Sequence, residues 1–318
     1  MSSRRLRVVI VTSSYWPHEG GAERQLRQVF SSDGVARELD VRVLTEPLEG
    51  APRREVVDGL TVVRSGRRTP LVDTAGAQFG VGILAWLARW QPDLVVSSQV
   101  GVASVAAGLH ARRTGIGHVV RLSGAGLLGP PENPVDTLNT HSRHWPLIRG
   151  TLRNPKCAVV APANHMVDSA IEQLPELAGR IRHIPNGVDQ LAVERATDPD
   201  GEVIWYGRND WFKNPTGFIE VVRMCPELRF GAIGRADLPV LPNLVNHGWQ
   251  GDPLPTIAKA KAVLLTSRYE GSPNFALQAL ALGVPVVGFR IAALEELAKQ
   301  HPDMVFLGRQ DDPHSLAI

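Results

Sequence analysis

The chain has 318 residues and a formal net charge of +2, and 43% of its residues are hydrophobic. This length is sufficient for about two domains with buried cores. Proteins that bind duplex DNA or RNA are usually far more basic, so the charge argues against a nucleic-acid partner.

Cysteine usage and hydropathy indicate a cytoplasmic protein. Cys157 and Cys225 are far apart, which excludes a disulfide framework and predicts reduced, packed thiols. The apolar run at residues 8–11 is too short for a signal peptide and predicts a first strand. No stretch approaches the roughly 20 apolar residues of a transmembrane helix. The pairs Arg67-Arg68 and Arg112-Arg113 are expected on a solvated surface, with peripheral membrane contact as the alternative.

Short apolar runs alternate with segments of helical spacing along the whole chain. The runs predict buried strands at residues 7–12, 41–45, 93–97, 118–122, 158–161, 182–184, 202–206, 229–233, 262–266 and 285–288. Helices are predicted between most of them, including residues 22–30, 83–90, 102–113, 215–224 and 292–300. Asp58-Gly59 joins two β-rich runs within residues 56–64 and predicts a hairpin. This alternation predicts an α/β protein with parallel sheets covered on both faces.

A glycine-rich turn follows the first predicted strand. Gly20-Gly21 opens a helix there, and adjacent glycines let a ligand approach the backbone while helix N–H groups stay free. The pair is not the G-x-G-x-x-G of a dinucleotide site, so we do not predict NAD binding. His18 lies in the same turn, where packing or solvent exposure is the alternative to a role in binding.

A change of composition at residues 185–201 predicts a linker between two domains. We place the boundary near residue 190, giving domains at 1–190 and 191–318. Asp198 and Asp200 have metal-binding spacing but fall in this linker, so a solvated turn is expected. His141 and His144 have no further ligand at matching spacing, and no metal site is predicted.

Two segments of the second half carry phosphate and sugar chemistry. Arg208 and Lys213 follow a predicted strand on a loop, where α/β sheets bind ligands, and together can neutralise a diphosphate. The alternative is that both face water. Further on, Glu270 precedes a Gly-Ser-Pro-Asn turn, an amphipathic helix at about residues 273–282 and an interior strand. This places a helix N-terminus beside a carboxylate, an arrangement suited to a phosphate that bears a hydroxylated group.

These motifs form a familiar set. GGAE from Gly20, PNGVD from Pro185, GRNDWFKN from Gly207 and EGSPNFALQALALGVPVV from Glu270 together resemble the retaining glycosyltransferases of the family 4 type, glycosyl transferases group 1. The resemblance covers about residues 7–310. It implies the GT-B architecture, with two Rossmann-like, doubly wound parallel-sheet domains facing a cleft. The N-terminal domain would lie on the acceptor side, and the C-terminal domain would bind the nucleotide sugar.

The resemblance also implies roles for individual residues. Arg208 and Lys213 match the pair that contacts the donor diphosphate, and Glu270 matches the acidic residue that contacts donor-sugar hydroxyls. Gly21 matches an N-domain glycine whose amide approaches the donor phosphate. Trp249 matches the position that meets the nucleobase, and Gln278 matches the position that binds the ribose. The remaining donor-binding candidates lie in the two C-terminal turns: Gly207, Gly271, Ser272, Pro273, Asn274 and Phe275.

The sequence departs from the family pattern at three places. Gln278 replaces a second glutamate that binds ribose, and Ser123, flanked by Arg121, replaces a sugar-positioning histidine. Both Arg121 and Ser123 are candidates for positioning the sugar or the acceptor. The chain ends at residues 311–318 in what resembles the start of a helix, so the C-terminal domain is expected to be short or truncated.

The resemblance implies front-face transfer from a nucleoside-diphosphate sugar, the co-substrate, without metal or cofactor. The acceptor would be a small molecule, a lipid or a saccharide. Two alternatives stay open. The first is a non-catalytic GT-B sugar-nucleotide-binding partner or degenerate subunit. Gln278, Ser123 and the short C-terminus favour it slightly, whereas the intact Arg208, Lys213 and Glu270 argue against it. The second is an enzyme of the same architecture with different chemistry, such as a sugar-nucleotide epimerase or hydrolase.

Overall fold

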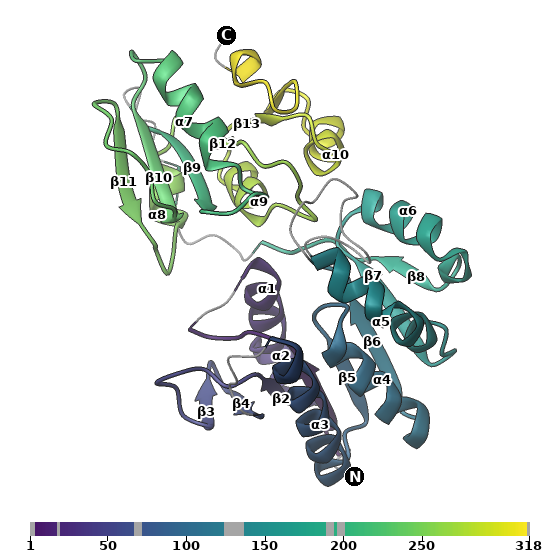
Figure 1. Ribbon diagram of the computed structural model, residues 1–318. Coiled ribbons are helices and arrows are strands. Elements are labelled where there is room, and N and C mark those ends of the chain that lie inside the picture. The colour runs from purple at the N-terminus through teal and green to yellow at the C-terminus, as the bar shows by residue number, and fades with distance from the viewer. Residues whose placement is uncertain are drawn as a thin grey trace. The chain divides into compact units, whose positions relative to one another are not determined.

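The computed structural model describes residues 4–17, 20–66, 72–123, 137–188, 194–195 and 201–316, without the side chains of residues 72–78 and 137–144. The chain divides into two compact units, Met1–Pro185 and Asn186–Ile318 (Figure 1). The boundary expected from the sequence, near residue 190, lies about five residues after the one between Pro185 and Asn186. Residues 189–193, which include the expected boundary, are outside the described part of the chain.

The first unit is built on an eight-stranded sheet in the order β3-β4-β2-β1-β5-β6-β7-β8. Neighbouring strands are parallel except β3 and β4, which form an antiparallel pair. The strands are β1 Leu6–Val11, β2 Leu39–Thr45, β3 Arg54–Val57, β4 Leu60–Arg64, β5 Leu94–Ser97, β6 Gly117–Arg121, β7 Cys157–Ala161 and β8 Ile181–His183. The helices are α1 Gly21–Phe30, α2 Asp33–Glu38, α3 Val72–Trp90, α4 Val102–Thr114, α5 Thr137–Leu152 and α6 Asn164–Gln173, with a 3-10 turn at Pro175–Leu177.

The second unit is built on a six-stranded, wholly parallel sheet in the order β11-β10-β9-β12-β13-β14. Its strands are β9 Val203–Arg208, β10 Phe230–Arg235, β11 Leu244–Gly248, β12 Ala262–Leu265, β13 Val286–Phe289 and β14 Val305–Gly308. Its helices are α7 Pro215–Met224, α8 Leu254–Ala258, α9 Asn274–Ala281 and α10 Ala292–Gln300, with a 3-10 turn at Pro313–Leu316.

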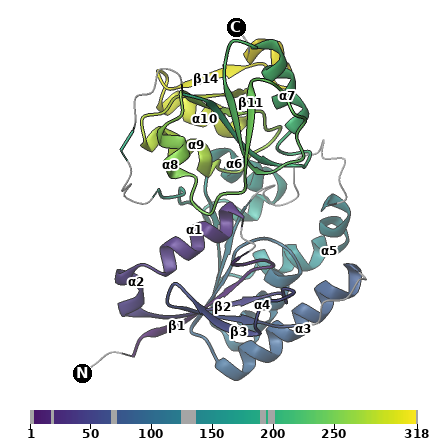
Figure 2. The same cartoon turned by 90° about the vertical axis from the view of Figure 1, so that its left-hand side faces the viewer.

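Both sheets bury both faces, as the sequence predicted. In β1, Val8 and Ile10 belong to one apolar cluster, whereas Val9 and Val11 belong to the cluster on the opposite face. In the second unit α8, α9 and α10 pack on one face and α7 packs on the other (Figure 2). Consecutive side chains of a strand point to opposite faces, so a strand buried on both sides reads as a continuous apolar run.

Several predicted elements need correction. Helix α3 begins at Val72 instead of residue 83, and β9 continues to Arg208, so Arg208 is the last strand residue and not a loop residue. Strands β11 and β14 and helix α8 were not predicted. Both cysteines are free and buried, as expected. No helix in the described ranges is both long enough and apolar enough to cross a membrane.

The predicted hairpin is present between β3 and β4, and it allows a test of backbone strain. Gly59 has φ +78°, and a Cβ added there would meet nothing within 4 Å, so only the left-handed backbone penalises a side chain. We expect Gly59→Ala to lower the free energy of unfolding by about 1 kcal/mol. Gly34→Ala in α2 is the matched control, because Gly34 has equally open space without a positive φ. Equal urea midpoints for the two variants would contradict this expectation.

Candidate functional site

The second sheet reverses its winding between β9 and β12. The chain passes from β9 outward to β10 and β11, then returns to β12 on the other side of β9 and continues to β13 and β14. The carboxyl ends of the two strands flanking such a switch point are where open α/β sheets bind ligands. The segment after β9 carries Lys213, and the segment after β12 carries Glu270.

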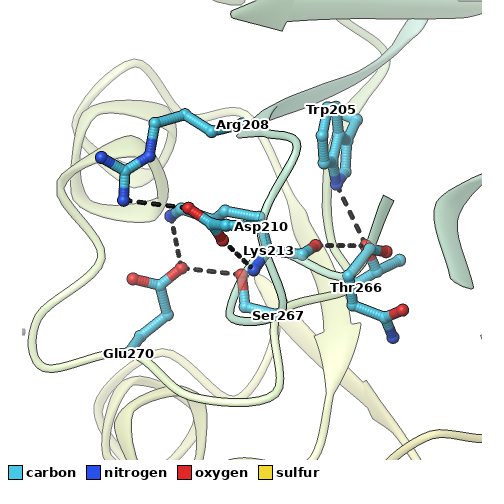
Figure 3. A network of polar contacts seen from close by, with 8 residues as sticks. Trp205, Arg208, Asp210, Lys213, Thr266, Ser267 and Glu270 are labelled. Carbon is cyan, nitrogen blue, oxygen red and sulfur yellow. Dashed lines mark hydrogen bonds and ion pairs between the residues drawn. The ribbon is translucent and has the colours of Figure 1, made fainter. Parts of the chain in front are cut away.

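These two segments hold a cation against a carboxylate. Lys213 Nζ lies 2.6 Å from Glu270 Oε1, and Ser267 Oγ donates a hydrogen bond of 2.7 Å to the same oxygen. Figure 3 shows the lysine and the glutamate pointing toward one another. The Lys213 side chain is 21% exposed and the Glu270 side chain 12% exposed, so both are only partly accessible to solvent. Burial, followed by the charge of Glu270, raises the pKa of Tyr269 to about 12.

Arg208 joins the same edge of the sheet through a carboxylate that sequence reasoning missed. Its guanidinium lies 3.0 Å from Asp210 Oδ2, and its side chain is mostly exposed (Figure 3). Asp210 Oδ1 in turn accepts a 2.9 Å hydrogen bond from the backbone N–H of Lys213. Asp210 therefore connects the Arg208 guanidinium to the backbone of Lys213. The sequence signal that could have identified Asp210 is its position between the basic residues Arg208 and Lys213.

Helix α9 begins beside this pair. Pro273 is the N-cap residue of this helix, and its side chain cannot accept a hydrogen bond from the helix. Phe275 is buried and stacks on Tyr206 of β9 with ring centroids 5.3 Å apart, which fixes the helix start against the switch point. Asn186 Nδ2 donates to Asn274 Oδ1 at 2.6 Å, so the PNG segment touches the first helical residue. Gly271 is buried, whereas Ser272 and Gln278 are partly exposed.

The neighbouring strand ends carry an aromatic surface. Trp249 follows β11 and is 42% exposed, and the Arg235 guanidinium at the end of β10 lies 5.3 Å from its ring centroid. An exposed indole under a cation can stack a planar ring. Gly207 lies within β9, where an added Cβ would come 2.3 Å from the Trp205 ring.

In the first unit, the predicted glycine turn opens α1 at Gly21. Gly20 is the N-cap, and its N–H donates to Glu23 Oε2 at 2.9 Å. Glu23 is buried and also accepts from Gln99 Nε2 at 3.2 Å. Sequence reasoning gave Glu23 no role, although a glutamate three residues after an N-cap is a capping-box signal.

The remaining candidates of the first unit are placed as follows. Arg121 ends β6, and its pKa is lowered by burial against an opposing effect of Glu23. Ser123 is partly exposed just beyond that strand. His18 lies outside the described residues, as do Asp198 and Asp200. The side chains of His141 and His144 are likewise outside the description. Among the described residues, no group of three or more His, Cys, Asp or Glu side chains could hold a metal ion.

The structure thus brings Arg208, Lys213 and Glu270 together with the start of α9 at one edge of the second sheet. Gly21, Arg121 and Ser123 lie in the first unit, near the carboxyl ends of β1 and β6. The predicted binding roles of all these residues stay predictions. Chemically, the second-unit group offers two cations, the N-terminus of a helix and a carboxylate acceptor.

Comparison with known proteins identifies the family. The model of Glycosyltransferase Family 4 matches residues 19–190, and the model of Glycosyl transferases group 1 matches residues 202–318. A comparison with curated proteins found no match. Sucrose-phosphate synthase from Thermosynechococcus elongatus aligns with a TM-score of 0.81 and 15% identity, covering 98% of this chain and 88% of that one.

Two further solved structures have the same fold. HepE from Anabaena, solved in complex with UDP and glucose, gives a TM-score of 0.75 at 17% identity, covering 98% of this chain and 88% of its own. WaaG, described as a glycosyltransferase involved in lipopolysaccharide biosynthesis, gives 0.75 at 14% identity, covering 97% and 88%. The expected GT-B architecture is therefore confirmed, and the chain belongs to glycosyltransferase family 4.

Proposed function

We propose that this protein transfers a sugar from a nucleoside-diphosphate sugar to a hydroxyl acceptor with retention of configuration. The observation that carries the proposal is the contact between Lys213 and Glu270 at the switch point of the second sheet. A cation and a carboxylate side by side suit a ligand that has a phosphate and hydroxyl groups within a few ångströms of each other.

In the proposed binding step the donor diphosphate exchanges partners with the two carboxylates. Lys213 is paired with Glu270 and Arg208 with Asp210, so each cation already has an anionic partner. The diphosphate takes their place, aided by N–H groups at the start of α9. Glu270 Oε1 is then free to accept a hydrogen bond from a sugar hydroxyl. In this proposal Gln278 contacts the ribose and Trp249 the base.

In the proposed reaction the acceptor hydroxyl attacks from the face that the diphosphate leaves. Its oxygen bonds to the anomeric carbon while the bond from that carbon to the phosphate oxygen breaks, and the electron pair stays on the diphosphate. The hydroxyl proton passes to the departing phosphate oxygen. Arg208 and Lys213 stabilise the growing negative charge, so no metal ion is required in this proposal.

The comparisons support the donor class. HepE was solved with UDP and glucose, and sucrose-phosphate synthase and WaaG are named for sugar or lipopolysaccharide synthesis. These names favour a nucleotide-sugar donor and a saccharide acceptor for this chain as well. Gly21, Arg121 and Ser123 are proposed to contact the donor phosphate, the sugar or the acceptor from the first unit.

A donor screen tests the proposed function. Incubation with UDP-, ADP- and GDP-sugars should release nucleoside diphosphate and free sugar slowly from one of them, and EDTA should leave that rate unchanged. Nuclear magnetic resonance of a transfer product should show the anomeric configuration of the donor. Arg208→Ala should remove most of the activity, whereas Arg290→Ala, which alters another exposed arginine paired with a carboxylate, should not.

Each other outcome has a definite meaning. Nucleotide-sugar binding without turnover in the presence of varied acceptors would indicate the non-catalytic alternative. Inversion of configuration would contradict the front-face mechanism, and loss of activity with EDTA would contradict metal independence.

A further inference from the structure

One buried hydroxyl contacts the backbone of Lys213 without taking part in the Lys213–Glu270 ion pair. Thr266 directly follows β12 and is 0% exposed. Its Oγ1 accepts a 3.0 Å hydrogen bond from the indole Nε1–H of Trp205 on β9. The hydroxyl shares its single proton between two carbonyl oxygens, that of Lys213 at 3.2 Å and that of Asn214 at 3.1 Å (Figure 3).

The two carbonyls belong to a sharp turn of the backbone. Asn214 has φ +48°, in the left-handed region, and its side chain caps α7 by accepting from the Gly217 N–H at 3.1 Å. Lys213 is also held from its N–H side, through Asp210 Oδ1. Thr266 therefore completes the fixation of Lys213 in the turn between β9 and α7.

The geometry also ties together the two segments that supply the ion pair. Thr266 and Glu270 follow β12 on one segment, and Lys213 follows β9 on the other. A lysine side chain is a flexible four-carbon chain, so the position of Nζ depends on where the backbone places Cα. The hydrogen bond from Thr266 to the Lys213 carbonyl therefore fixes the position of the Lys213 Cα relative to the segment that carries Glu270.

We propose that Thr266 is a positioning residue, which fixes the backbone of Lys213 so that its ammonium group meets Glu270 and the donor diphosphate. This inference rests on the proposed function for its diphosphate part. The contact of Thr266 with the Lys213 segment is independent of any ligand.

Three variants separate positioning from general stability. Thr266→Val keeps the side-chain volume but removes the hydroxyl, which leaves the carbonyls of Lys213 and Asn214 without this donor. Thr266→Ser keeps the hydroxyl. Trp205→Phe removes the indole donor and weakens a stacked core contact with Phe218, but leaves the hydroxyl's contacts with both carbonyls.

The measurements are calorimetric binding of UDP, ADP and GDP and hydrogen exchange of the peptide that spans residues 209–214. Thr266→Val should weaken binding of the preferred diphosphate about tenfold, the size of one buried hydrogen bond, and should speed exchange of that peptide. Thr266→Ser should restore both to near wild type. Trp205→Phe should bind the diphosphate within about threefold of wild type although its unfolding midpoint falls.

Two results would overturn the proposal. The first is unchanged exchange and unchanged binding in Thr266→Val. The second is an equal loss of binding in Trp205→Phe, which would show that a weaker fold causes the effect. Failure of the wild type to bind any of the three diphosphates would contradict the proposed function instead, and hydrogen exchange alone would then decide the role of Thr266.

Discussion

Replacing Lys213 with alanine should lower kcat/KM for the nucleotide-sugar donor by about 100-fold or more. Removal of one preorganised donor to a developing negative charge commonly has an effect of this size. Lys213 is the less exposed of the two proposed phosphate-binding cations, because its side chain is 21% exposed and that of Arg208 is 66% exposed. Water screens a partly buried charge less, so Lys213 should contribute more than Arg208.

The pairing of Lys213 with Glu270 gives this experiment an internal check. In Lys213→Ala the carboxylate of Glu270 keeps its bond from Ser267 but loses its cation, so some activity is lost through an unpaired charge. The double variant Lys213→Ala/Glu270→Gln removes that charge. The double variant should therefore regain only the part of UDP binding that the unpaired carboxylate had removed. If diphosphate binding is the main role of Lys213, the double variant should still bind UDP much more weakly than Glu270→Gln alone does.

A surface lysine supplies the control. Lys299→Ala on α10 removes an exposed charge far along the chain from the site and should change kcat/KM by less than about twofold. Initial rates at several donor concentrations give kcat and KM separately for each variant. A Lys213→Ala enzyme that keeps wild-type kcat/KM would remove this residue from the proposed mechanism.

The fold was largely predictable because two-sided burial leaves a strong mark on the sequence. The strand predicted at residues 262–266 appears as β12 Ala262–Leu265, every residue of which is buried. Strand β11 was missed because it is an edge strand whose Asn246 and His247 are exposed, so it carries little apolar signal. The first half of α3 was missed because its glycines, among them Gly76, Gly80 and Gly82, weaken a helical pattern.

The candidate site was predictable where strand ends determine position. Arg208 ends one apolar strand, Lys213 follows that strand and Glu270 follows the adjacent one, and adjacent parallel strands bring their carboxyl ends together. The partners of these residues were not predictable, because the Asp210, Ser267 and Thr266 contacts depend on side-chain geometry across separate segments. In the first unit, Glu23 could have been identified from the sequence, because a glutamate three residues after a glycine N-cap supplies half of a capping box.

Acid should destabilise the protein through one buried histidine that has no role in the proposed mechanism. His118 on β6 is 1% exposed, and burial lowers its pKa from the ordinary 6.5 to about 4. Its Nε2 lies 2.9 Å from Ser97 Oγ, and within the described residues Nδ1 has no hydrogen-bond partner. A protonated ring would bury a positive charge and an unpaired N–H, which explains why the folded state resists protonation.

The direction of the effect follows from proton binding. Below pH 6.5 the unfolded chain binds a proton at His118 that the folded chain excludes until about pH 4. The stabilisation is therefore fully present above pH 6.5 and is lost as the pH falls toward 4. At about 1.4 kcal/mol per pKa unit, the loss from this residue amounts to about 3 kcal/mol by pH 4.

Urea unfolding at pH 7, 5.5 and 4 measures this loss. His118→Gln removes the titrating ring, so its free energy of unfolding should fall by about 3 kcal/mol less than that of the wild type between pH 7 and pH 4. Burial and Arg113 also lower the pKa of His110, so some loss persists in the variant. His183→Gln, which alters an exposed histidine on β8, should keep the wild-type dependence on pH. Parallel pH profiles for wild type and His118→Gln would show that the buried ring is not the group responsible, because only a site protonated differently in the two states can change stability with pH.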